Sequence, residues 1–92
     1  MILGAGPPAG KDAAWLEQLD RKLLGAHARG DAAALVSLYT QAADLREAQG
    51  DIAAACFYLT QAFVFSLEGG LPEAETLNLR LHAHGRAHWL EF

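Results

Sequence analysis

The side chains best suited to binding a metal ion lie near the C-terminal end, where three of the four histidines occur. These are His82, His84 and His88, and imidazole nitrogen is a common ligand of zinc and related metals. On a helix, however, His82 and His84 would be separated by about 200°. Gly85 interrupts the helix that would align His84 with His88, and Glu91 is the one acidic neighbour. We therefore predict a solvated helix end with no metal, and metal binding through this His-rich end stays as an alternative function.

The single cysteine could in principle act as a nucleophile beside a histidine. Cys56 lies within an apolar run, however, and nothing in the sequence around it would activate a thiol, so a buried thiol is predicted. The chain also has no G-x-S-x-G motif and no glycine-rich phosphate loop after a strand. These absences predict a protein that is not an enzyme and needs no cofactor. One cysteine cannot form an internal disulfide, which favours a cytoplasmic location.

Composition restricts the classes of partner. The chain has 92 residues, enough for one domain, and 52% of them are apolar, which is more than a small domain easily buries. This excess favours contact with another protein or with a second copy of the chain. Eleven acidic residues outnumber seven basic ones and no basic run occurs, so nucleic-acid binding is not expected.

Glycines divide the chain at a regular interval. Gly-Asp pairs at 30–31 and 50–51 are followed by a Gly pair at 69–70, a repeat of about 20 residues. Glycine can adopt the left-handed conformation that ends a helix, and aspartate can cap the start of the next one. No segment alternates polar and apolar residues as a strand would. The pattern predicts an all-α fold of four antiparallel helices joined by short turns.

The predicted helices cover residues 12–28, 32–48, 52–67 and about 72–84, with Pro72 at the first helical position of the last one. Residues 1–11 are predicted to be a flexible N-terminal arm, and residues 12–92 a single helical domain. On the second helix, Asp44 and Glu47 fall on the outward side, where solubility is the simplest role. Arg46 falls on the apolar side, where it is expected to extend along the surface near the helix C-terminus.

The third predicted helix is the most apolar segment. Its 16 residues would extend about 24 Å, short of the roughly 30 Å that a membrane crossing requires, so no membrane span is expected. One side of this helix is predicted to be core. That side consists of Ile52, Ala55, Cys56, Leu59, Ala62, Phe63, Ser66 and Leu67.

The opposite side of the same helix carries large side chains that need a cover. The predicted binding surface consists of Phe57, Tyr58, Gln61, Val64, Phe65 and, from the tail, Trp89, with Phe92 as an addition. The cover is the first helix, the C-terminal tail, a second copy or another protein.

Residues 30–70 resemble a tetratricopeptide repeat, a helical hairpin that binds peptides and proteins. The matching residues are Tyr39, Ala43, Gly50, Ala55, Leu59 and Ala62, at the aromatic, small, turn and small–large–small positions. Ala42 and Arg46 depart from the family's pattern, and the hairpin period here is about 40 residues instead of 34. The resemblance implies a surface for protein recognition.

The predicted function is therefore a non-enzymatic protein–protein interaction module, a small adaptor or regulator, that uses an apolar helix face. The alternative is an obligate homodimer in which the same face joins two copies of the chain.

Overall fold

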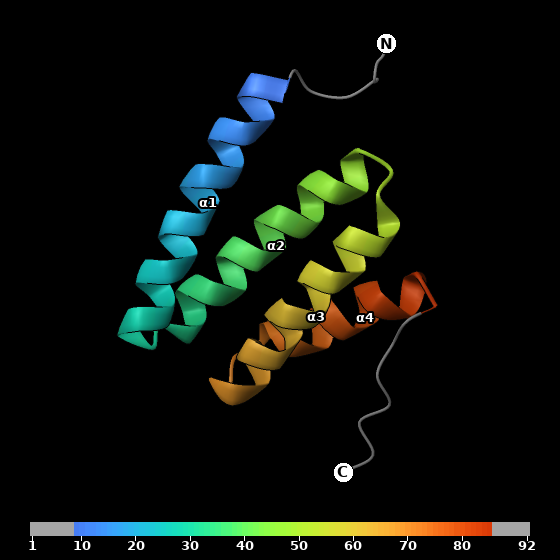
Figure 1. Ribbon diagram of the computed structural model, residues 1–92. Coiled ribbons are helices and arrows are strands. Elements are labelled where there is room, and N and C mark those ends of the chain that lie inside the picture. The colour runs from blue at the N-terminus through green and yellow to red at the C-terminus, as the bar shows by residue number, and fades with distance from the viewer. Residues whose placement is uncertain (1–8, 86–92) are drawn as a thin grey trace.

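Four α-helices form the fold, as predicted. The computed structural model describes residues 9–85 and contains α1 (Ala9–Arg29), α2 (Ala32–Ala48), α3 (Ile52–Glu68) and α4 (Glu73–Ala83). No strand occurs in these residues, so the fold is all-α. Consecutive helices run in opposite directions, with α1 at one edge of the molecule (Figure 1).

The two Gly-Asp turns have the conformation that their residue types predict. Gly30 and Gly50 have φ angles of 64° and 78°, which residues with a side chain rarely adopt. Asp31 and Asp51 then accept hydrogen bonds of 3.1 Å from the backbone N–H groups three residues later. Each aspartate thereby satisfies one of the free donors at a helix N-terminus. These turns hold α1, α2 and α3 antiparallel.

The observed ends of the helices differ from the predicted ones by up to three residues. The bounds of α2 are as predicted, α3 is one residue longer, and α1 begins at Ala9 instead of residue 12. Pro72 lies just before α4, not inside it, and contributes no side-chain cap. Gly85, with φ of 73°, ends the last helix at the predicted place.

The core forms where α3 packs between α2 and α4. Helix α2 makes its most extensive contact with α3, whereas α1 packs mainly on α2. Leu59 and Leu81 are fully buried, and the free thiol of Cys56 is buried as predicted. The buried core cluster consists of Val36, Ala43, Cys56, Leu59, Ala62, Phe63, Leu77 and Leu81.

Small residues allow α2 and α3 to approach closely. Ala42 and Ala43 on α2 and Ala55 and Ala62 on α3 are all fully buried. The predicted core side of α3 is correct except for Leu67, which is 41% exposed. Leu67 is one residue from the helix end and about 80° around the helix from Leu59, so neighbouring helices leave much of it uncovered.

The length and the apolar character of the described helices bear on the expectation of no membrane span. Within residues 9–85, none of the helices is both long enough and apolar enough to cross a bilayer.

Candidate functional site

The predicted surface on α3 is partly open to solvent. Phe57 is 57% exposed and Val64 is 40% exposed, while Gln61 between them is half-buried. These residues are spaced i, i+4 and i+7, so they lie on one stripe along the helix, and Glu68 continues it at i+11. We refer to these four residues as the α3 stripe. Trp89, the remaining predicted member of the surface, lies outside the described residues.

An aromatic row lies beside the α3 stripe and joins three helices. It consists of His27, Tyr39, Phe65, Tyr58 and Phe57. The rings of Tyr39 and Phe65 are nearly parallel, with centroids 5.9 Å apart. His27 meets Phe65 edge to face at 5.3 Å, and Phe57 meets Tyr58 in the same way at 5.4 Å. Such contacts stabilise ring pairs beyond the area that they bury. The row therefore holds Phe57 at the edge of a fixed surface.

Tyr39 is the polar centre of the aromatic row. Its hydroxyl oxygen lies 3.3 Å from Nε2 of His27. Partial burial raises the pKa of Tyr39 above its usual value of 10.0, and the neighbouring Tyr58 raises it further. Tyr39 is thus a neutral phenol at physiological pH, suited to hydrogen bonding and ring contact.

The aromatic row covers part of the predicted surface on α3. The end of α1, through His27, and helix α2, through Tyr39, cover Phe65, and Tyr39 also covers Tyr58. Phe57 and Val64, in contrast, remain exposed to solvent. The chain therefore covers one flank of the predicted surface within the described residues, and the α3 stripe stays accessible.

A hollow of about 140 Å³ lies at the end of the stripe, between the α1–α2 turn and α3. Its lining combines apolar side chains with one acidic group. The lining residues are His27, Gly30, Ala32, Leu35, Phe65 and Glu68. The hollow can receive an apolar side chain, with a positive charge near Glu68.

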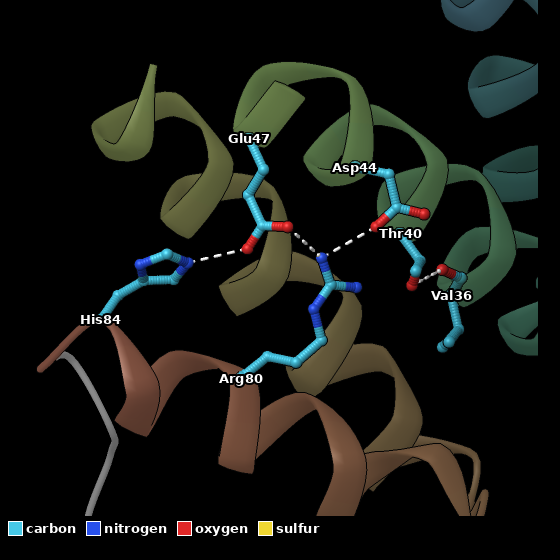
Figure 2. A network of polar contacts seen from close by, with 6 residues as sticks. All are labelled: Val36, Thr40, Asp44, Glu47, Arg80 and His84. Carbon is cyan, nitrogen blue, oxygen red and sulfur yellow. Dashed lines mark hydrogen bonds and ion pairs between the residues drawn. The ribbon is translucent and has the colours of Figure 1, made fainter. Parts of the chain in front are cut away.

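A second cluster of side chains ties α4 to α2 (Figure 2). The guanidinium of Arg80 donates from Nη2 to Asp44 Oδ1 and to Glu47 Oε1, each at 2.8 Å. His84 Nε2 lies 2.7 Å from the other oxygen of Glu47, and since a carboxylate can only accept, the imidazole is the donor. We refer to these four residues as the polar network.

The polar network corrects two interpretations of the sequence. Asp44 is exposed as expected, but Glu47 is half-buried and both carboxylates bind Arg80. His84, at the end predicted to be solvated, is half-buried and binds Glu47. Glu47 and His84 are 37 positions apart, so their meeting depends on how α4 crosses α2. Arg46 is on α2 as expected and donates to Gln49 at 2.7 Å.

The hydrogen bonds of the polar network shift two pKa values. The bond from His84 lowers the pKa of Glu47 most, partial burial opposes this, and Arg80 lowers it further, so the value falls below 4.5. Burial opposes the charge of Arg80, but its bonds to Asp44 and Glu47 outweigh this and raise its pKa. The network therefore favours an ionised carboxylate paired with a cation.

The His-rich end lies partly within the described residues. Among residues 14–85, no three His, Cys, Asp or Glu side chains are grouped so that they could hold a metal ion. His82 is exposed, His84 is bound to Glu47, and His88 and Glu91 lie outside the described residues.

Replacing Glu47 with glutamine should make the protein less stable at neutral pH by about 1 kcal/mol, because partly exposed charged pairs contribute little each. A lowered folded-state pKa stabilises the fold above the unfolded value and loses that effect as pH falls through the folded value. The melting temperatures of wild type and variant should therefore converge as the pH falls below 4.5. Thermal unfolding followed by circular dichroism between about pH 7 and pH 3 measures this.

Glu17→Gln is the matched control, because Glu17 is exposed and makes no ion pair within the described residues. A stability difference between wild type and Glu47→Gln that stays constant over this pH range would contradict the role given to the Glu47 carboxylate.

Comparison with protein-family models, with curated proteins and with solved structures finds no match to this chain. The assignment of a function therefore depends on the α3 stripe, the aromatic row and the polar network. Two contacts were not predicted from the sequence. One is the contact of His27 with Phe65 in the aromatic row, and the other is the binding of Glu47 to Arg80 and His84. No local spacing signals either contact, because each joins residues that are far apart in the chain.

Proposed function

We propose that this protein is a non-enzymatic protein-interaction module, an adaptor or small regulator, that binds its partner through the α3 stripe. The observation that carries the proposal is the exposure of Phe57 and Val64 on the most apolar helix of the fold. Exposed aromatic side chains held by packed neighbours are typical of residues that dominate binding energy. The aromatic row supplies that support for Phe57.

The geometry favours a helical segment as the bound element. The α3 stripe extends over 12 residues of one helix, about 16 Å, which matches the apolar stripe of an amphipathic helix in another protein. A large apolar side chain of that helix would fill the hollow beside Phe65. A Lys or Arg near it would pair with Glu68, which makes no ion pair within the described residues.

Charge favours a different protein over a second copy of this chain. Helix α3 has no basic residue, while Asp51 precedes it and Glu68 ends it. In a parallel pair of α3 helices the two Glu68 side chains would meet, and like charges oppose that arrangement. In an antiparallel pair joined through the stripe, Glu68 of each copy would lie against Phe57 of the other, with no cation on α3 to pair with it.

The relation to tetratricopeptide proteins is part of the same proposal. Its support is the burial of Ala43 on α2 and of Ala55, Leu59 and Ala62 on α3, the small and large positions that carried the resemblance. Helical hairpins of that family present surfaces to peptides and proteins, which agrees with a recognition role.

Replacing Phe57 with aspartate should weaken partner binding by at least about 30-fold, the effect of losing a residue that contributes about 2 kcal/mol. The far-UV circular dichroism should be unchanged, because Phe57 is largely exposed. The partner is first isolated with immobilised protein from the native cell and identified by mass spectrometry. Its affinity for wild type, Phe57→Asp and Val64→Asp is then measured by calorimetry.

Leu79→Asp is the matched control, since Leu79 is 64% exposed but lies on α4, away from the α3 stripe. Equal loss of affinity in this variant would mean that added charge, not the stripe, is responsible. Sedimentation equilibrium of the protein alone should give a monomer. If the wild-type protein is a dimer and Phe57→Asp is a monomer, the stripe is a self-association surface. That result would refute the proposal that the stripe binds a different protein.

A further inference from the structure

A basic groove runs between α1 and the first half of α2. It has a volume of about 320 Å³, within the range of small-molecule sites. Its lining joins three cations of α1 to small and apolar residues. The lining residues are Arg21, Lys22, Gly25, Arg29, Ala34, Ser37 and Leu38. This lining contains no carboxylate, although the whole chain has a net charge of −4.

Gly25 lies in the wall of the groove, beneath the guanidinium of Arg29. It lies in the interior of α1 with an ordinary helical backbone, a position where glycine destabilises a helix relative to alanine. A Cβ atom there would come within 3.2 Å of Nη1 of Arg29. The guanidinium of Arg29 thus lies over the backbone of Gly25, four residues earlier in α1. The Arg29 side chain therefore extends along the helix in the direction of Lys22. A side chain at this position would require the guanidinium to shift by a few tenths of an ångström.

The charged groups of the groove are largely free to bind an anion. Among the side chains of residues 14–85, neither Arg21 nor Lys22 makes an ion pair, and Arg29 makes one exposed contact of 3.5 Å, with Asp31. Ser37 Oγ accepts a hydrogen bond from Gln41 at 3.2 Å, which leaves its own proton free to donate. Arginine and lysine next to a free hydroxyl are donors that suit a phosphate group.

We propose that this groove binds a small phosphate monoester. Arg21, Lys22 and Arg29 hold the phosphate, and the apolar part of the ligand lies against Ala34 and Leu38. A doubly charged phosphate matches three cations better than a single carboxylate does, and the apolar wall favours an organic ester over the free ion.

This site is separate from the proposed protein-binding surface. His27, which joins the aromatic row, is six residues after Arg21 and about 240° around α1. The groove and the aromatic row therefore lie on different sides of the helix, and either proposal can fail without the other.

Titration of the full chain with phenyl phosphate, followed by amide NMR shifts, tests the proposal. We expect saturable shifts at Gly25, Ser37 and Leu38, and weaker binding of inorganic phosphate at the same amides. Arg21→Gln and Lys22→Gln should each raise the Kd at least about tenfold. Gly25→Ala should raise the melting temperature and change the Kd less than either charge removal, because the added Cβ requires the Arg29 guanidinium to shift by only a few tenths of an ångström.

Lys11→Gln is the control, because it removes the same charge from α1 about 15 Å before Arg21. An equal loss of affinity in this variant would show attraction by charge alone and overturn the proposal. Shifts that do not saturate, or that occur elsewhere in the chain, would also overturn it. Binding of inorganic phosphate as tight as that of phenyl phosphate would refute an ester as the ligand.

Discussion

Replacing Leu59 with alanine is expected to lower the free energy of unfolding by about 2–5 kcal/mol. Leu59 is fully buried in α3, in the core cluster shared with α2 and α4, so its removal leaves a cavity that touches three helices. For a domain of this size, such a loss should lower the melting temperature by at least about 8 °C. Urea unfolding monitored by circular dichroism measures the change directly.

The comparison variant is Leu24→Ala, because Leu24 is 70% exposed on α1 and should change stability by less than about 0.5 kcal/mol. A similar effect of the two substitutions would mean that α3 is not the centre of the core. The order of the two effects is therefore a test of the fold itself.

Enlarging Ala43 to leucine should destabilise the protein by about 1–3 kcal/mol, although leucine is as good a helix former as most residues. Ala43 is fully buried in the core cluster, on the helix that makes the most extensive contact with α3. The added side chain has no space unless the two helices separate. Urea unfolding at neutral pH measures the loss, and a separation of the helices should also increase amide exchange in α3.

Ala48→Leu is the matched change, because Ala48 is exposed at the end of α2. Its effect should be close to zero. If Ala43→Leu is equally well tolerated, the close packing of α2 on α3 is wrong.

The number and order of the helices could be predicted from the sequence because local chemistry determines them. Glycine at positions 30 and 50 and aspartate at positions 31 and 51 act within one turn of the chain, and both pairs behave as their residue types predict. The start of α1 was placed three residues late because the Gly-rich and Pro-rich composition before residue 12 favours a loop. Pro72 and Leu67 were misplaced for a similar reason, since both lie at helix ends, where local patterns are weakest.

The polar network and the aromatic row could not be predicted in the same way. Helical periodicity correctly placed Asp44 and Glu47 on one side of α2, but it does not say which helix crosses that side. The crossing of α4 decides that Arg80 binds both carboxylates. Likewise, the predicted surface on α3 named Tyr58 and Phe65 without His27, because the end of α1 reaches α3 only through the tertiary arrangement.

The packing of each helix mainly on its neighbours in the chain has a consequence for how the protein folds. Nearly all contacts between helices join segments separated by a turn of a few residues, so little loop-closure entropy opposes their formation. Topologies of this kind fold quickly, and formation can begin at the α2–α3 pair and extend outward in both directions. Helices α1 and α4, each packed mainly on one neighbour, would then be the first to detach when the native state fluctuates. The polar network acts at one of these two ends, where it delays the release of α4.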